Sequence, residues 1–170
     1  MKNVIVGQSG GPTAVINSSL LGVFKTAKDR GADIVYGMVH GIKGLLDRNI
    51  VDLSTQIKND LDMDLLKRTP SSFLGSCRYK LPDIEGNEKT YQEIFKILKE
   101  LDIHAFFYIG GNDSMDTIKK LSDYGEKVKS PIRFMGVPKT IDNDLAITDH
   151  TPGYGSAAKY IASTTKEIIR

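Results

Sequence analysis

The sequence predicts an α/β fold: a doubly wound, mostly parallel sheet with helices on both faces. Short apolar runs typical of buried strands alternate with segments whose apolar residues recur at helical spacing. Glycine-rich or acidic loops follow three of these strands. Because the carboxyl ends of parallel strands meet at one edge of a sheet, we expect the three loops to form one binding site.

Short apolar runs predict four strands, over residues 4–6, 34–39, 105–109 and 133–137. Apolar residues at helical spacing predict helices over residues 13–28, 88–101, 114–124 and 154–170, with a short helical turn over residues 41–46. Gly31 is expected to cap the end of the first helix, and Ser114 is expected to cap the start of the helix over 114–124. Residues 52–82 carry no regular pattern.

The composition is that of an ordinary globular domain, with 170 residues and a net charge of +2 at pH 7. Lysine and arginine are scattered rather than clustered, so no nucleic-acid partner is expected. The single cysteine, Cys77, excludes an intramolecular disulfide and favours a reducing compartment. No apolar run approaches the ~20 residues of a membrane span, and no signal-peptide pattern is present, so a cytoplasmic protein is expected.

The first glycine-rich loop, residues 7–12, lies between a predicted strand and a predicted helix. Glycines let backbone N–H groups approach an anion closely, and a helix N-terminus adds a favourable field. The loop matches neither the dinucleotide-binding fingerprint nor the P-loop pattern. Taken alone, it is compatible both with a phosphate cradle and with a plain tight turn.

The second loop, residues 110–114, adds Asn112 and Asp113 to the same arrangement. A carboxylate at a helix start that faces phosphate is unfavourable unless a cation or a basic group neutralises it. Mg²⁺ or a nearby lysine would provide that charge. The alternative is that both side chains only favour the turn and cap the helix.

The third loop, residues 138–144, carries Lys139, Asp142 and Asp144. The two acids are close enough in sequence to serve one site, one as a base and the other as a metal ligand or orienting group. Lys139 is a point charge suited to phosphate oxygens. A surface loop with Asx turns would explain one acid but not the whole set. Arg78 is a weaker candidate for a phosphate contact, since a lone loop arginine is usually solvated.

Five segments, in order along nearly the whole chain, together resemble the phosphofructokinase family. They are GQSGGPTAVINSSL (7–20), SSFLGSCR (71–78), GGNDS (110–114), PKTIDND (138–144) and TPGYGSA (151–157). The resemblance implies a phosphofructokinase-like fold and a cytoplasmic enzyme that transfers a phosphoryl group to the 1-hydroxyl of fructose 6-phosphate with Mg²⁺. It also implies a donor-binding domain over residues 1–137, followed over residues 138–170 by the active-site loop and first helix of a second, truncated domain.

The resemblance assigns roles to individual residues of the loops. Asp142 resembles the base that accepts the proton of the sugar hydroxyl, and Asp144 and Thr140 resemble its neighbours at the sugar and the transferred phosphoryl group. The residues expected to contact the phosphoryl donor are Gly11, Arg78, Gly111, Asp113 and Lys139.

Two positions predict which donor is used. The ATP-using branch of the family typically has glycine where this chain has Asp113 and Lys139. Both side chains would fill space that a nucleotide needs and could pair with each other, while the lysine supplies the charge that pyrophosphate requires. The chain therefore resembles the pyrophosphate-dependent branch.

Asn112 departs from the family, which commonly has a metal-linked aspartate at this position. An amide oxygen is a neutral and weaker ligand for Mg²⁺, which often keeps most of its waters. Metal ligation at Asn112 would therefore be supplemented by Asp113, Asp142 or Asp144.

Family members are much longer than this chain, and the helical pattern at Ile168 to Arg170 stops without a cap. The chain is therefore expected to be an N-terminal fragment, inactive alone, of a homo-oligomeric enzyme. Three alternatives stay open: an ATP-dependent phosphofructokinase, a non-catalytic phosphate- or nucleotide-binding domain on the same fold, and a lipid or NAD kinase with a similar glycine loop. A non-catalytic domain has no use for a base at Asp142, and the PKTIDND segment argues against the lipid and NAD kinases.

Overall fold

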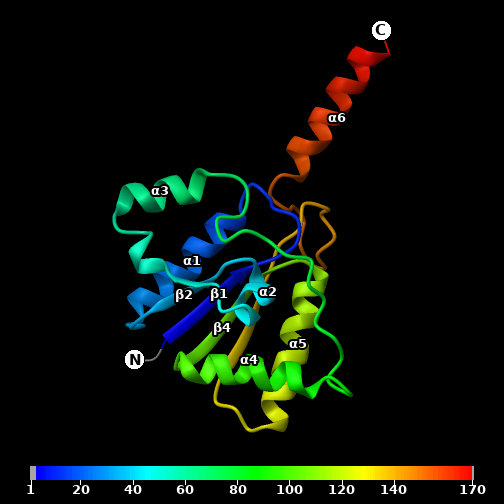
Figure 1. Cartoon of the computed structure of the whole chain (residues 1–170). Helices are drawn as coiled ribbons and strands as arrows, with labels where there is room; N and C mark the ends of the chain where they lie inside the picture. The colour runs from blue at the N-terminus through cyan, green and yellow to red at the C-terminus, as the bar shows by residue number, and fades with distance from the viewer. Residues whose placement is uncertain (1–2, 170) are drawn as a thin grey trace.

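The computed structural model describes residues 3–169 and has a five-stranded sheet at its centre (Figure 1). The strands are β1 (Asn3–Gln8), β2 (Val35–Met38), β3 (Ile50–Asp52), β4 (Ile103–Gly110) and β5 (Arg133–Pro138). Their order in the sheet is β3-β2-β1-β4-β5, and all neighbours are parallel except β3, which is antiparallel to β2. The predicted α/β fold with a mostly parallel sheet is confirmed.

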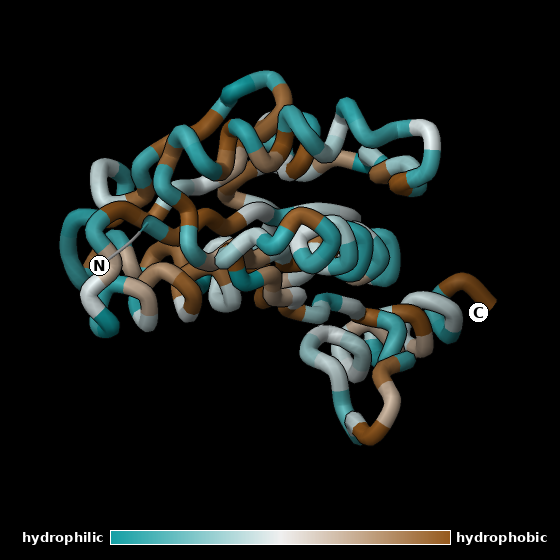
Figure 2. Tube along the Cα trace, turned by 90° about the horizontal axis from the view of Figure 1, so that it is seen from below, coloured by the Kyte–Doolittle hydropathy of each residue, from teal (hydrophilic) through white to brown (hydrophobic). Residues whose placement is uncertain are grey.

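Helices cover both faces of the sheet (Figure 1). One face carries α1 (Ile16–Asp29), the 3₁₀ helix η1 (Leu53–Thr55) and α3 (Asp60–Arg68). The other face carries α2 (Gly41–Leu46), α4 (Glu88–Glu100) and α5 (Asn112–Lys127). The last helix, α6 (Tyr154–Ile168), buries none of its residues and projects away from the layered body (Figures 1 and 2).

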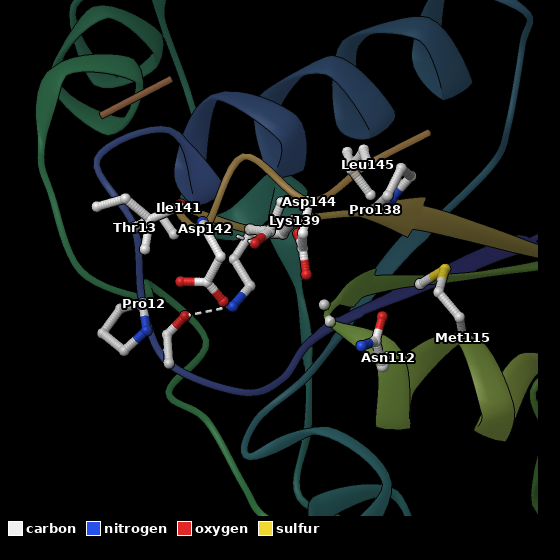
Figure 3. A pocket seen from close by; sticks show the side chains of 14 residues that line it. Pro12, Thr13, Asn112, Met115, Pro138, Lys139, Ile141, Asp142, Asp144 and Leu145 are labelled. Carbon is white, nitrogen blue, oxygen red and sulfur yellow. Dashed lines mark hydrogen bonds between the residues drawn. The ribbon is translucent and has the colours of Figure 1, made fainter. Parts of the chain in front are cut away.

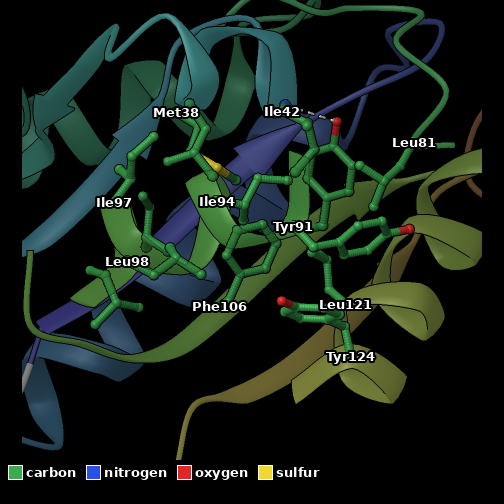
Figure 4. Packing of buried hydrophobic residues seen from close by; sticks show 14 residues of the cluster. Met38, Ile42, Leu81, Tyr91, Ile94, Ile97, Leu98, Phe106, Leu121 and Tyr124 are labelled. Atoms are coloured by element: carbon green, nitrogen blue, oxygen red, sulfur yellow. Dashed lines mark hydrogen bonds between the residues drawn. The ribbon is translucent and has the colours of Figure 1, made fainter. Parts of the chain in front are cut away.

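The core is divided between the two faces because successive side chains of a strand point to opposite sides. Ile5 of β1 and Phe106 and Tyr108 of β4 are fully buried against α2, α4 and α5 (Figure 4). Val6 and Ile109 point the other way and are buried beneath α1. The sheet is thus anchored from both sides, which holds the ends of β1 and β4 in place at the edge where their loops leave.

Several details differ from the sequence-based expectations. Helix α5 begins at Asn112, so Gly111 is its N-cap and the expected cap residue Ser114 lies buried inside the first turn. The reason is that Gly110 and Gly111 allow the chain to become helical at once, with the Ser114 side chain packed directly beneath Gly110. The division into two domains at residue 138 stays a prediction.

Three elements between residues 50 and 68 were not predicted from the sequence: β3, the 3₁₀ helix η1 and α3. The strand β3 is short and partly exposed, so it lacks the continuous apolar run of a buried strand. The helix α3 has a single buried residue, Leu66, and is started by Asn59, whose side chain accepts a hydrogen bond from the backbone N–H of Asp62. Within residues 3–169, no helix is both long and apolar enough to cross a membrane.

Replacing Phe106 with alanine is expected to lower the free energy of unfolding by about 3–5 kcal/mol, because the ring is fully buried in the centre of its cluster. Its centroid lies 5.5 Å from that of Phe134 and 6.2 Å from that of Tyr108. Tyr160→Ala, on the exposed α6, is the control and should change stability by about 0.5 kcal/mol or less. Urea unfolding measures both, and equal losses in the two variants would contradict this account of the core.

Candidate active site

The three loops predicted to share a site meet at one edge of the sheet and enclose a pocket of roughly 290 Å³ (Figure 3). The sheet order reverses between β1 and β4, which is where open α/β sheets bind their ligands. The pocket is lined by Gly11, Pro12, Thr13, Gly110, Gly111, Asn112, Met115, Pro138, Lys139, Thr140, Ile141, Asp142, Asp144 and Leu145.

Lys139 connects all three loops. Its backbone N–H donates to the carbonyl oxygen of Gly110 at 2.9 Å, which continues the pairing of β4 and β5. Its side-chain Nζ donates to the carbonyl oxygen of Gly11 at 2.6 Å, as the dashed line in Figure 3 marks. The ammonium group is therefore held beside the first glycine loop.

Burial lowers the pKa of Lys139, and the negative charge of Asp142 opposes this effect. The side chain is partly buried beside the first glycine loop. At alkaline pH it loses its charge before an ordinary exposed lysine does. The site thus holds one accessible cation next to a carboxylate.

Two glycines are required in the first two loops, one by its backbone conformation and the other by the packing around it. Gly10 has φ of 77°, in the left-handed region that side chains disfavour. A Cβ at Gly110 would collide with the side chain of Ser114 and lie 3.2 Å from the carbonyl oxygen of Ser9. A larger residue would strain the backbone at Gly10 and would displace Ser114 at Gly110.

The third loop is shaped by hydrogen bonds of its own side chains. The hydroxyl Oγ1 of Thr140 accepts a hydrogen bond from the backbone N–H of Asp142 at 2.9 Å. Asn143 is left-handed, with φ of 56°, and its Oδ1 accepts from the backbone N–H of the buried Thr151 at 2.8 Å. These bonds fold the loop so that Asp142 and Asp144, on either side of Asn143, both line the pocket.

The fold brings most of the predicted site residues to one pocket. The predicted residues that line it are Gly11, Gly111, Asn112, Lys139, Thr140, Asp142 and Asp144. Asp113 and Arg78 are exposed and do not line it. The expected pairing of Asp113 with Lys139 is wrong: across residues 3–169 no ion pair joins them, because Lys139 reaches to Gly11 instead.

The sequence of the chain also matches a known protein family. The family model described as Phosphofructokinase matches residues 3–170. The chain belongs to the phosphofructokinase family.

Relatives within the phosphofructokinase family differ in their donors. The chain is 49% identical, over 94% of its length, to the pyrophosphate–fructose 6-phosphate 1-phosphotransferase of Rhodospirillum rubrum. It is 34% identical, over 92% of its length, to the ATP-dependent 6-phosphofructokinase of Vibrio cholerae, of which it covers 44%. The crystal structure of the pyrophosphate-dependent phosphofructokinase from Nitrosospira multiformis matches with a TM-score of 0.85 and 43% identity over 98% of this chain.

The chain spans only part of these proteins. It covers 38% of the Rhodospirillum rubrum enzyme and 41% of the Nitrosospira multiformis chain. The chain is thus less than half as long as these relatives.

The ligand set of the pocket fits the Mg²⁺ expected of a phosphofructokinase. Asp142, Asp144 and Asn112 offer two carboxylates and one amide oxygen. In the part of the chain that the structure describes, no group of three or more His, Cys, Asp or Glu side chains forms a metal cage. Mg²⁺ prefers one or two carboxylates together with waters and phosphate oxygens, so these residues suit an ion that binds along with a phosphate ligand.

Sequence reasoning missed residues that shape this phosphofructokinase site. Thr13 and Met115 line the pocket, and the Thr13 hydroxyl is buried with no hydrogen-bond partner among the described residues. Gln8 and Asn17 are fully buried beside the first glycine loop. These two residues could have been found from the sequence, because each is a polar residue at a position where the apolar pattern of its strand or helix predicts a buried side chain.

Proposed function

We propose that the full-length enzyme containing this chain transfers a phosphoryl group from pyrophosphate to the 1-hydroxyl of fructose 6-phosphate. The observation that carries the proposal is the position of Lys139, whose ammonium group is held between the first glycine loop and Asp142. The pyrophosphate-dependent relatives support the same donor. The single cysteine, Cys77, suits the reducing environment of the cytoplasm.

Asp142 is the proposed base. It takes the proton of the sugar 1-hydroxyl while the hydroxyl oxygen attacks one phosphorus of pyrophosphate. The bond from that phosphorus to the bridging oxygen breaks, inorganic phosphate leaves, and the proton on Asp142 passes to solvent or to the released phosphate. Thr140 keeps the loop in the shape that aims this carboxylate into the pocket, and Asp144 is proposed to lie beside it at the sugar.

Lys139 and the glycine loops are proposed to bind the donor. The ammonium group is a point charge for phosphate oxygens, and Gly11 and Gly111 leave room for close approach of backbone to anion. Arg78 and Asp113 are proposed to border the donor from outside the pocket lining. Mg²⁺ would be held by Asp144 and Asn112 together with the phosphates, which leaves Asp142 free to act as the base, and it would neutralise charge on the transferred group.

Steady-state kinetics of the full-length enzyme tests the proposal, with fructose 6-phosphate as acceptor and either pyrophosphate or Mg-ATP as donor. We expect kcat/KM for pyrophosphate to exceed that for ATP by about ten- to a hundredfold, because one charged hydrogen bond contributes about 1.5–3 kcal/mol. A higher kcat/KM with ATP would show that the donor is wrong. The proposal that fructose 6-phosphate is the acceptor would then be tested separately, by whether the enzyme phosphorylates it with either donor.

A further inference from the structure

Two amide side chains, Gln8 and Asn17, form a buried pair under the first glycine loop. Gln8 is the last residue of β1 and has 0% exposure, while Asn17 lies in the first turn of α1 with 2% exposure. Nε2 of Gln8 donates to Oδ1 of Asn17 at 3.0 Å and to the carbonyl oxygen of Ile16 at 3.2 Å. Burying amide groups is unfavourable unless their hydrogen bonds are made. The other hydrogen-bond partners of the two side chains therefore indicate what the pair does.

Those remaining partners all belong to one segment, residues 69–74. Oε1 of Gln8 accepts hydrogen bonds from the backbone N–H of Leu74 at 2.8 Å and from the hydroxyl of Ser72 at 3.0 Å. Oδ1 of Asn17 accepts from the backbone N–H of Phe73 at 2.8 Å, and its Nδ2 donates to the carbonyl oxygen of Thr69 at 2.9 Å. The backbone donors fix which end of each amide is the oxygen, so the pair has one arrangement.

The same segment continues to Arg78 along the first glycine loop. Oγ of Ser76 donates to the carbonyl oxygen of Gly10 at 2.5 Å, and Oγ of Ser9 donates to the carbonyl oxygen of Cys77 at 3.2 Å. Arg78 comes next, with its side chain exposed. The path of the chain up to this arginine is therefore set by contacts with β1, α1 and the loop that follows β1.

We propose that Gln8 and Asn17 are positioning residues that hold residues 69–77 in place and so present Arg78 to the phosphoryl donor beside Gly11. The proposal rests on the donor-binding role of Arg78 in the proposed function. An apolar pair of similar volume would fill the same space and preserve the core, but it could not hold the backbone at Thr69, Phe73 and Leu74. The amides thus act on the position of a segment rather than on packing.

Hydrogen exchange of the full-length protein tests the first half of the proposal, with Asn17→Leu as the variant. The backbone amides of Phe73 and Leu74 should exchange about tenfold faster or more, because their acceptors are lost or displaced. Leu98→Ala, in α4 on the opposite face of the sheet, is the matched control and should leave these two amides unchanged. Unchanged protection of Phe73 and Leu74 in the variant would overturn the proposal whatever the donor is.

A double-mutant cycle with Arg78→Ala tests the second half. Asn17→Leu should raise KM for pyrophosphate by about tenfold, leave KM for fructose 6-phosphate unchanged, and have no further effect once Arg78 is alanine. A smaller folded fraction would lower the measured rate but would not change KM, so a purely structural role gives a different result. The Asn17→Asp variant, which keeps the acceptor for Phe73 and loses the donor to Thr69, serves if the leucine variant does not fold.

The outcomes separate this proposal from the proposed function. Equal rises in KM with and without Arg78, or no effect of Arg78→Ala itself, would overturn the positioning role. Preference of the wild type for ATP would overturn the donor assignment alone, and the same cycle run with ATP would still decide whether Gln8 and Asn17 act through Arg78.

Discussion

Replacing Asp142 with asparagine is expected to lower kcat of the full-length enzyme by about 10²–10⁴-fold, because an amide cannot accept the proton of the sugar hydroxyl. Asparagine has nearly the same shape as aspartate, and the bond from the backbone N–H of residue 142 to Oγ1 of Thr140 does not depend on the side chain. The loop should therefore keep its form, and KM for pyrophosphate should change little. Steady-state kinetics with saturating fructose 6-phosphate measures both parameters.

Asp149→Asn is the matched control for this experiment. Asp149 lies in the same connection between β5 and α6, is exposed, and does not line the pocket. Its replacement removes one negative charge near the site without removing the proposed base, so kcat should stay close to that of the wild type. A loss below about tenfold in Asp142→Asn, or an equal loss in the control, would mean that Asp142 is not the base.

Replacing Lys139 with glycine is expected to weaken the use of pyrophosphate by about ten- to a hundredfold in kcat/KM, which corresponds to the loss of one charged hydrogen bond. The ammonium group is the cation that lines the pocket, and its removal also frees the carbonyl oxygen of Gly11. The same substitution empties the space between the first and third loops. Kinetics with pyrophosphate and with Mg-ATP separates the two effects.

Charge and volume at position 139 are distinguished by Lys139→Met, which keeps most of the length of the side chain and loses the charge. Both variants should lose pyrophosphate activity, but of the two only Lys139→Gly should gain activity with ATP. Full pyrophosphate activity in Lys139→Met would contradict the role of the charge, and equal ATP use in the methionine and glycine variants would contradict steric exclusion.

Much of the fold was predictable because its signals are local. Apolar runs closed by glycine marked β1 and β4, and helical spacing marked α1 and α4, since each pattern reflects one buried face. The elements that were missed, β3 and α3, bury little and therefore carry little pattern. Ser114 was misassigned as a cap because cap preferences are local, whereas the start of α5 depends on how Gly110 packs against the neighbouring loop.

The chemistry of the site was also readable from the chain, because parallel strands bring their following loops to one edge. That rule was enough to place Asn112, Lys139 and Asp142 in one pocket. It did not predict which groups touch, since strand order decides which loops are neighbours. The bond of Lys139 to Gly11 joins residues 128 positions apart, and no local pattern encodes it.

The sequence by itself thus determined the class of fold, the edge at which ligand binds and the types of side chain available there. The tertiary structure alone decided that Lys139 reaches the first glycine loop rather than Asp113, and that Arg78 stands outside the pocket lining. It also decided that the buried amides of Gln8 and Asn17 hold the segment leading to Arg78. The physical reason is that hydrogen bonds depend on distances between groups far apart in the chain, and only packing of the sheet and its helices sets those distances.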